Sequence, residues 1–330
     1  MSLSEESLQQ LLQVAEGLLG APLCLREIGG GGNHRLLRLA SAEGEYALKY
    51  DPLPDASGRD RLAREWHAIA FLREQGMTDL PQPLAWSAQD RCALYQWIDG
   101  QRVTALTLPL VTEMLAFLQR LRRLEGLPSA RQMPLASDAF VTPSAVVAQF
   151  RRRYERLWQG QQDPELQKFL QQRLLPLAET VMAQAETALA DLWQQTVPMM
   201  LSPSDFGIHN LLRQADGRLI FLDLEYFGWD DPSKLCSDFL WHPAMLCPED
   251  AARCWLQGMQ ALSHEDADFR QRFAALHPLN GLIWCLILLN PFLPEGWQRL
   301  TTSQPKEQLL AQRLAEANQR VQLIKKGLPS

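Results

Sequence analysis

The sequence lacks a long uninterrupted apolar segment, internal repeats and low-complexity tracts. Its longest apolar run covers only residues 281–289, whereas a membrane-spanning helix needs about 20 residues. We therefore expect this run to be a core helix that ends at Asn290-Pro291, and we expect no membrane partner. With 330 residues, 46% of them apolar, the chain can instead bury a full core.

Also missing are an excess of basic residues, cysteines at metal-binding spacing and a recognisable signal peptide. The formal net charge of −6 argues against a surface that binds nucleic acid. The N-terminus is acidic, and Ser2 and Glu5 have the spacing of a helix capping box, so we expect no leader segment. The cysteines lie in apolar contexts, which is typical of reduced, buried thiols in a cytoplasmic protein. They are Cys24, Cys92, Cys236, Cys247, Cys254 and Cys285.

What the sequence does contain is a group of oxygen-bearing side chains around one predicted hairpin. Asp205 and Asn210 lie five positions apart, and Asp223 ends the apolar run that follows them. The Asp216-Gly217 pair divides this run into two short strands, as in a tight hairpin. Oxygen ligands suit Mg²⁺, and Mg²⁺ with a carboxylate base is what phosphoryl transfer requires. Taken alone, the spacing is also compatible with ordinary turn chemistry.

Two longer segments make the pattern specific. Residues 202–210 read Ser-Pro-Ser-Asp-Phe-Gly-Ile-His-Asn, and residues 221–232 read Phe-Leu-Asp-Leu-Glu-Tyr-Phe-Gly-Trp-Asp-Asp-Pro. Together they resemble the small-molecule kinases of the aminoglycoside phosphotransferase and choline kinase group. The resemblance implies a protein-kinase-like fold, with ATP and Mg²⁺ as cofactors and a hydroxyl group of a small molecule as phosphate acceptor.

The resemblance also implies roles for individual residues. Asp205 corresponds to the catalytic base, and Asn210 and Asp223 correspond to the metal ligands. Glu225 matches the glutamate of the Asp-x-Glu-Tyr variant of the choline kinases. It is a candidate to contact the metal ligands without binding the metal itself. Asp238 corresponds to a buried aspartate that braces the catalytic loop.

A kinase also needs a segment that holds the nucleotide, and two earlier stretches are candidates. A glycine run between two apolar stretches permits backbone to approach phosphates closely, although a flexible hairpin turn is the alternative. The resemblance to the Gly-rich loop of the family favours the phosphate interpretation. A later strand ends at Asp99-Gly100 and is predicted to connect two lobes, with its backbone bonded to adenine. The candidate nucleotide-binding residues are Gly29, Gly30, Gly31, Gly32 and Asn33 in the first stretch, and Gln96, Trp97 and Ile98 in the second.

Lysine is scarce, and Lys49 is the only one in the first half of the chain. It lies in a strand-like run, where a lysine can also serve to discourage edge pairing. A compact ammonium is well suited to phosphates. Glu65, in a segment of helical periodicity at 61–72, is the best candidate partner for Lys49, like the Lys–Glu pair of kinases. The alternative for Glu65 is a solvated position on that helix.

The predicted fold class is α+β, with a protein-kinase-like division into two lobes. Residues 1–99 are expected to form a β-rich nucleotide-binding lobe with a leading helix near 4–18 and one further helix. Residues 100–330 are expected to form a mainly helical lobe that carries the catalytic loop and the acceptor site, with strands only around Asp216-Gly217. The helices of the second lobe are expected near 109–124, 142–158, 164–194, 248–262, 266–289 and 304–325.

The identity of the acceptor stays open. Asp230, Asp231 and Glu225 are candidates to attract an amino-sugar, although Asp231 before Pro232 also fits turn chemistry. His242 is a candidate to line the acceptor pocket. The tryptophans of the second half are suited to a cage for a cation such as choline, or to the core.

A different functional class is a nucleotide-binding regulator without transfer activity. Pro203, where the family usually has a histidine two residues before the base, favours this alternative. The joint presence of Lys49, Asp205, Asn210 and Asp223 speaks against it.

Overall fold

The computed structural model describes residues 5–30, 35–51, 60–160, 163–245, 247–298, 300, 302 and 304–327, and the side chains of residues 27–30 lie outside this description. Two compact units share the chain. The first comprises Met1–Thr104, His209–Phe227 and Gln298–Thr301, and the second comprises Ala105–Ile208, Gly228–Trp297 and Thr302–Ser330. Neither unit is one continuous segment, and the predicted functional division at residue 99 stays a prediction.

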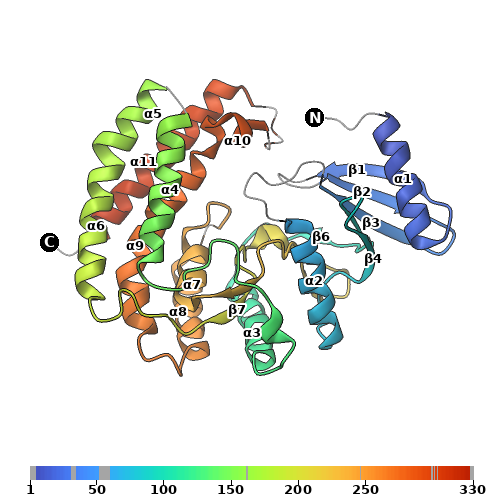
Figure 1. Cartoon of the computed structure of the whole chain (residues 1–330), viewed down its shortest axis with the longest axis horizontal. Helices are drawn as coiled ribbons and strands as arrows, with labels where there is room; N and C mark the ends of the chain where they lie inside the picture. Colours follow the sequence, from blue (N-terminus) through green and yellow to red (C-terminus); the bar gives the residue numbers. More distant parts are fainter. Residues whose placement is uncertain are drawn as a thin grey trace. The chain divides into compact units, whose positions relative to one another are not determined.

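The first unit is built on an antiparallel sheet of five strands in the order β1-β2-β3-β5-β4. Helix α1 (Glu5–Leu19) lies beside this sheet (Figure 1). It contributes Leu11 and Ala15 to an apolar cluster with the sheet residues Leu37, Leu39 and Leu48. Helix α2 (Arg61–Glu74) begins at Asp60, whose side chain accepts a hydrogen bond from the Ala63 backbone amide at 2.8 Å. The strands are β1 (Cys24–Gly30), β2 (Arg35–Ala40), β3 (Glu45–Tyr50), β4 (Pro83–Ser87) and β5 (Cys92–Gln96).

A second small sheet in the same unit joins distant parts of the sequence. Strand β6 (Gln101–Arg102) pairs with β8 (Leu211–Arg213), which pairs with β9 (Leu219–Phe221). Asp216-Gly217 turns the chain between β8 and β9, as predicted, and Gly217 has a φ of 87°, which a residue with a side chain adopts at a cost. The hairpin therefore carries the residues on either side of it, Asn210 and Asp223, within the first unit.

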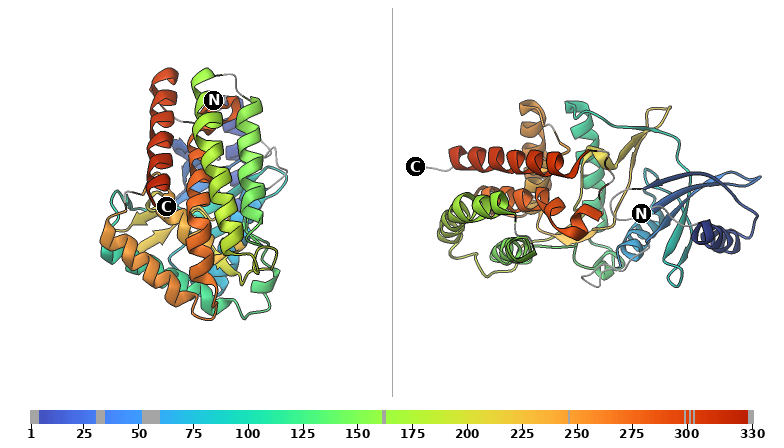
Figure 2. Two further views of the ribbon diagram at one scale, coloured as in Figure 1. Left: turned by 90° about the vertical axis from the view of Figure 1, so that its left-hand side faces the viewer. Right: turned by 90° about the horizontal axis from the view of Figure 1, so that it is seen from above.

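The second unit is mainly helical, as predicted. Long helices pack on α9, which contacts α4, α6, α7 and α11 (Figure 2). The helices are α3 (Leu108–Leu124), α4 (Ala145–Gly160), α5 (Pro164–Phe169), α6 (Leu175–Ala188), α7 (Pro232–Trp241), α8 (Glu249–Leu262), α9 (Phe269–Leu288), α10 (Pro294–Gln298) and α11 (Lys306–Gly327).

Several details of the second unit differ from the sequence prediction. Helices α7 and α10 were not predicted. The single helix expected over 164–194 is α5 and α6 joined by a π-helical stretch, Leu170–Leu174, and it ends at Ala188. Strands β7 (Met200–Ser202) and β10 (Gly228–Asp230), which pair antiparallel, were not predicted. Each has only three residues, which is too short for an alternating pattern to stand out.

Helix α9 contains the longest apolar run of the sequence. Among the described residues, Phe269–Phe292 is a candidate membrane span by length and composition, and 56% of its apolar window is buried inside the protein. Its residues Leu279, Leu282 and Leu286 are fully buried in the apolar cluster of the second unit. The structure therefore uses this run as a core helix, as predicted.

Candidate active site

Lys49 lies at the centre of a cluster of charges in the first unit. Its Nζ atom donates to both carboxylate oxygens of Glu65, at 2.6 and 2.8 Å, and lies 3.4 Å from Oδ1 of Asp223. Strand β3 supplies Lys49, helix α2 supplies Glu65, and the segment after β9 supplies Asp223. The structure thus brings together three predicted residues that are distant in the sequence.

Asp223 is held by the hairpin and by its own backbone conformation. The amide of Leu222 donates to the Asn210 carbonyl at 2.8 Å, directly after the paired residues Leu211 and Phe221. Asp223 itself has a φ of 62°, in the left-handed region that residues with side chains rarely adopt. Such backbone conformations concentrate at functional sites, where the surrounding structure compensates for their strain.

Burial and neighbouring charges oppose each other in this cluster. Burial lowers the pKa of the Lys49 ammonium, but Asp223 and Glu65 outweigh it and hold the pKa above its usual value. Burial raises the pKa of the Glu65 carboxyl, and Lys49 works against this rise. Burial, followed by the charge of Asp223, also raises the pKa of Glu225 to about 7. The carboxylates therefore repel one another in spite of Lys49.

Two arginines of α2, which the sequence analysis missed, contact the segment after Asp223. The Arg64 guanidinium donates to the Phe227 carbonyl at 2.9 Å. Nη1 of Arg61 lies 3.9 Å from Oε1 of Glu225, and the guanidinium carbon of Arg61 lies 5.4 Å from the centroid of the Tyr226 ring. Arg61, Arg64 and Glu65 follow the helical spacing that places side chains on one face, so this face of α2 holds both Lys49 and the segment after Asp223. The spacing of three and four residues between these side chains was the signal in the sequence that could have placed the two arginines beside Glu65.

This cluster has the donors that Mg²⁺ requires. Asn210 and Asp223 offer side-chain oxygens on adjoining backbone segments, and oxygen is the ligand type that Mg²⁺ prefers. The carboxylates of Glu65, Asp223 and Glu225 outnumber the cations of Lys49 and Arg61 by three to two. A divalent cation would relieve this excess negative charge, so the residues present fit the metal.

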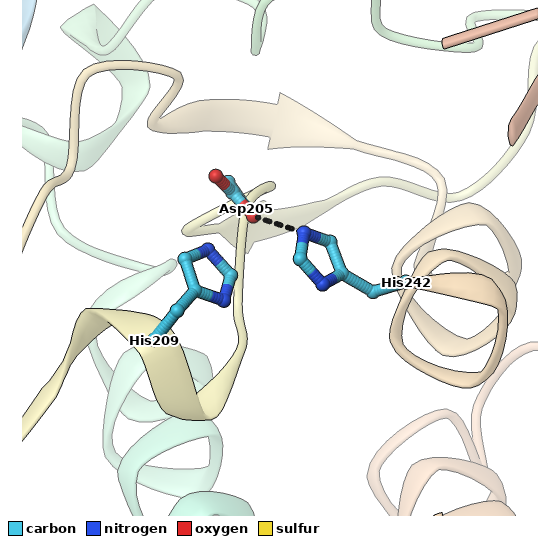
Figure 3. Close-up of side chains that lie close together, drawn as sticks. All are labelled: Asp205, His209 and His242. Carbon is cyan, nitrogen blue, oxygen red and sulfur yellow. Dashed lines mark ion pairs between the residues drawn. The ribbon is translucent and has the colours of Figure 1, made fainter. Parts of the chain in front are cut away.

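Asp205 lies in the second unit, on the turn that follows β7. The Ser204 amide donates to the Ser202 hydroxyl at 3.0 Å, and the Asp205 amide donates to the Pro203 carbonyl at 2.9 Å. Ser204 has a φ of 67°. The Asp205 carboxylate lies 3.6 Å from Nε2 of His242, which follows α7 (Figure 3). Because Asp205 belongs to one unit and Asn210 and Asp223 to the other, their convergence on one substrate stays a prediction.

Asp238, also in the second unit, contacts two side chains. Its carboxylate accepts hydrogen bonds from Lys234 at 2.9 Å and from the indole nitrogen of Trp284 at 2.8 Å. Its role as a brace for the catalytic loop stays a prediction.

Asp230 and Asp231 are fully buried and Glu225 is 2% exposed, which is incompatible with the suggestion that these carboxylates attract an amino-sugar. Asp230 accepts from the Phe140 amide and pairs with Lys234. Asp231 caps α7 and pairs with the buried Arg272, so the alternative of local turn chemistry is correct for Asp231. Burial next to a cation is the physical reason that neither Asp230 nor Asp231 is available to a ligand.

The predicted nucleotide-binding stretches are partly described. Gly29 and Gly30 end β1, where they pair with Leu36 and Arg35, whereas Gly31, Gly32 and Asn33 lie outside the described residues. In the connector, the amides of Gln96 and Trp97 donate to the carbonyls of Gln82 and Glu45, both at 2.9 Å. Their N–H groups are therefore engaged in the sheet region, which makes the Ile98 amide the better candidate to donate to adenine.

The small antiparallel sheet, the helical second unit and the Lys49–Glu65–Asp223 cluster define a phosphotransferase of protein-kinase-like fold. The sequence matches the Phosphotransferase enzyme family over residues 25–276, and the chain belongs to this family. It is therefore a small-molecule kinase, an enzyme that transfers phosphate to a hydroxyl group. The family resemblance and the fold class predicted from the sequence are both confirmed.

Solved structures agree with this fold. The gentamicin complex of APH(2'')-IIa is similar with a TM-score of 0.65 and 19% identity, covering 97% of both chains. Choline kinase from Cryptosporidium parvum matches with a TM-score of 0.61 and 12% identity, also covering 97% of both chains. Plasmodium vivax ethanolamine kinase matches with a TM-score of 0.61 and 11% identity, covering 96% of this chain and 91% of the other. No match was found among curated proteins.

Proposed function

We propose that this enzyme transfers the γ-phosphate of ATP, with Mg²⁺, to a hydroxyl group of a small amine-bearing molecule. The observation that carries the proposal is the Lys49–Glu65–Asp223 cluster, where an ammonium is fixed between two carboxylates at 2.6 and 3.4 Å. A lysine held in this way presents a stable point charge to phosphate oxygens. Similar structures with bound nucleotide support this use, among them the ADP and spectinomycin complex of APH(9)-Ia.

In the proposed mechanism each group of the chain has one task. Asn210 and Asp223 would hold Mg²⁺, and the ion would neutralise negative charge on the phosphates. Lys49 binds phosphate oxygens, and Glu65 keeps its ammonium in place. Asp205 accepts the proton of the acceptor hydroxyl while the hydroxyl oxygen forms a bond to the γ-phosphorus. At the same time the bond between this phosphorus and the β–γ bridging oxygen breaks, and ADP leaves.

The class of acceptor is inferred from the similar structures and stays part of the proposal. Their names include gentamicin, spectinomycin, choline and ethanolamine, all of which carry amino or ammonium groups. Trp255 is fully buried and stacks on Phe239 with ring centroids 3.9 Å apart, so this tryptophan belongs to the core and not to a cation cage.

All six cysteines are free thiols, which supports the proposed cytoplasmic location.

The experiment is an acceptor screen with ATP and Mg²⁺, read by ADP release and by the mass of the phosphorylated product. The panel contains gentamicin, spectinomycin, choline, ethanolamine and neutral sugars. We expect Asp205→Asn to bind ATP as the wild type does but to lose about 10²–10⁴-fold in transfer rate, because the general base is gone. Asp191→Asn, at an exposed aspartate of the second unit, is the matched control and should keep full activity. Tight ATP binding without any acceptor-dependent ADP release would contradict the proposal and would favour a regulator.

A further inference from the structure

Within the second unit, the side chain of His242 faces the carboxylate of Asp205 (Figure 3). Its Nε2 atom lies 3.6 Å from Oδ1 of Asp205, which is longer than a hydrogen bond but within ion-pair range. Both side chains are partly buried, with exposed fractions of 15% for His242 and 30% for Asp205. Pro203 offers no side-chain donor at the position where the family usually has a histidine. A histidine from a different part of the chain thus occupies the neighbourhood of the base.

A backbone contact decides which ring nitrogen of His242 carries the proton. The Ala244 amide donates to Nδ1 of His242 at 3.1 Å. A nitrogen that accepts a hydrogen bond cannot itself bear a hydrogen, so the neutral imidazole has its proton on Nε2. This is the nitrogen that faces Asp205, and the ring therefore presents an N–H donor to the carboxylate.

The orientation of the ring is fixed from its other side. The edge of the imidazole meets Trp284 with ring centroids 4.8 Å apart and an interplanar angle of 75°. The Trp284 indole nitrogen donates to Oδ1 of Asp238 at 2.8 Å, and Lys234 donates to Oδ2 of Asp238 at 2.9 Å. Lys234 is only 7% exposed and also pairs with the buried Asp230. A continuous series of contacts thus runs from the buried Lys234 to the base.

We propose that His242 is a positioning residue for the catalytic base, and that Trp284 and Asp238 hold its ring for this task. This inference rests on the proposed function. The Nε2–H group directs one oxygen of Asp205 and thereby sets the plane of the carboxylate that receives the hydroxyl proton. The distance of 3.6 Å shortens to a hydrogen bond when substrate binds, as is common for catalytic contacts that are long in the free enzyme. Asp238 then acts on the catalytic loop through Trp284 and His242.

Kinetics of His242 variants test the proposal, with ATP and the most active acceptor of the panel. His242→Phe keeps an aromatic ring against Trp284 but has no donor, and we expect kcat to fall about 10–100-fold with KM for ATP unchanged, because the base is misplaced. His242→Gln carries an amide donor near the position of Nε2 and should recover most of the loss. His264→Phe, at an exposed histidine of the same unit, is the matched control and should match the wild type.

Two kinetic results would overturn the proposal. One is wild-type kcat in His242→Phe. The other is a raised KM for the acceptor with unchanged kcat, which would make His242 an acceptor-binding residue.

A second measurement does not depend on activity. The ¹⁵N shifts and couplings of the imidazole ring report its tautomer, and we expect the proton of neutral His242 on Nε2 in the wild-type protein. A proton on Nδ1 would overturn the proposal even if the kinetics agreed. The two proposals can fail separately. If His242 has its proton on Nε2 but the protein phosphorylates no acceptor, the proposed function is contradicted. If the wild type is active and His242→Phe is equally fast, the positioning role is contradicted.

Discussion

We expect Lys49 to combine a structural and a functional task in one side chain. The Lys49 side chain is 20% exposed, and the side chain of its partner Glu65 is 1% exposed. Removal of one member of such a pair leaves the other charge buried without compensation, which is costly. A loss of activity in a Lys49 variant therefore has two possible causes, misfolding and the missing charge.

A double variant separates these causes. We expect Lys49→Met to lower the free energy of unfolding by up to about 3 kcal/mol, because Glu65 loses its cation. Lys49→Met/Glu65→Leu should regain most of this stability, since both charges are gone and the volume is kept. Urea unfolding measures the stability, and phosphate transfer should stay lost in both variants. Transfer restored in the double variant would show that Lys49 acts only through folding.

Helix α7 shows how a motif that resembles a ligand site serves a single element. Asp231 accepts the Ser233 amide at 2.8 Å as the cap of α7, and both of its oxygens also accept hydrogen bonds from Arg272 of α9, at 3.0 and 3.2 Å. Asp266 binds the same guanidinium. The cap thus joins α7 to α9 at a fully buried point.

Caps at two helices give a matched comparison at this scale. Asp163 caps α5 by accepting the Leu166 amide at 2.9 Å, and its replacement by alanine should cost about 1 kcal/mol, as for an ordinary cap. Asp231→Ala should cost about 3–5 kcal/mol, because it also leaves Arg272 buried beside a single carboxylate. Urea unfolding of both variants measures the two losses in unfolding free energy, and their ratio checks the prediction. Equal losses would mean that the pair with Arg272 adds nothing beyond the cap.

At the scale of the whole molecule, we expect stability to depend on a half-buried histidine, His277, whose protonation is disfavoured in the folded chain. His277 of α9 lies between Trp241 and Phe273, with ring centroids 4.9 and 4.8 Å away. Its Nδ1 atom is 2.8 Å from the Ser237 hydroxyl. Burial lowers the pKa of His277 from 6.5 to about 4, since the charged form loses its hydration.

The sign of the pH dependence follows from this lowered pKa. Between about pH 6.5 and 4 the unfolded chain binds a proton at this histidine that the folded chain does not, so stability falls as the pH falls. The full effect is about 3 kcal/mol at 1.36 kcal/mol per pKa unit. We expect wild-type unfolding free energy to decline more steeply than that of His277→Gln between pH 7.5 and 4.5. Parallel curves for the two proteins would contradict this expectation.

Local patterns predicted most of the elements and part of the site. Helix periodicity placed Glu65 on α2, and the Asp-Gly pair placed the hairpin, because both signals depend on neighbours in the sequence. The arginines of α2 were missed, since their partners lie more than 160 residues away and arginine has no distinctive local pattern there. His242 was noted only as a lining residue, because its contact with Asp205 depends on where α7 ends.

The sequence by itself determined the family and most of the long elements, and it supplied the candidate residues for binding Mg²⁺ and phosphate, because these depend on residue types at short spacings. The tertiary structure decided which carboxylates are available to a ligand. Asp223 is 36% exposed beside Lys49, whereas Asp230 and Asp231 are completely buried with cations of their own. In the sequence all three are acidic residues near the same motif. Burial arises from packing between distant segments, and it makes two of them structural while Asp223 stays open to solvent.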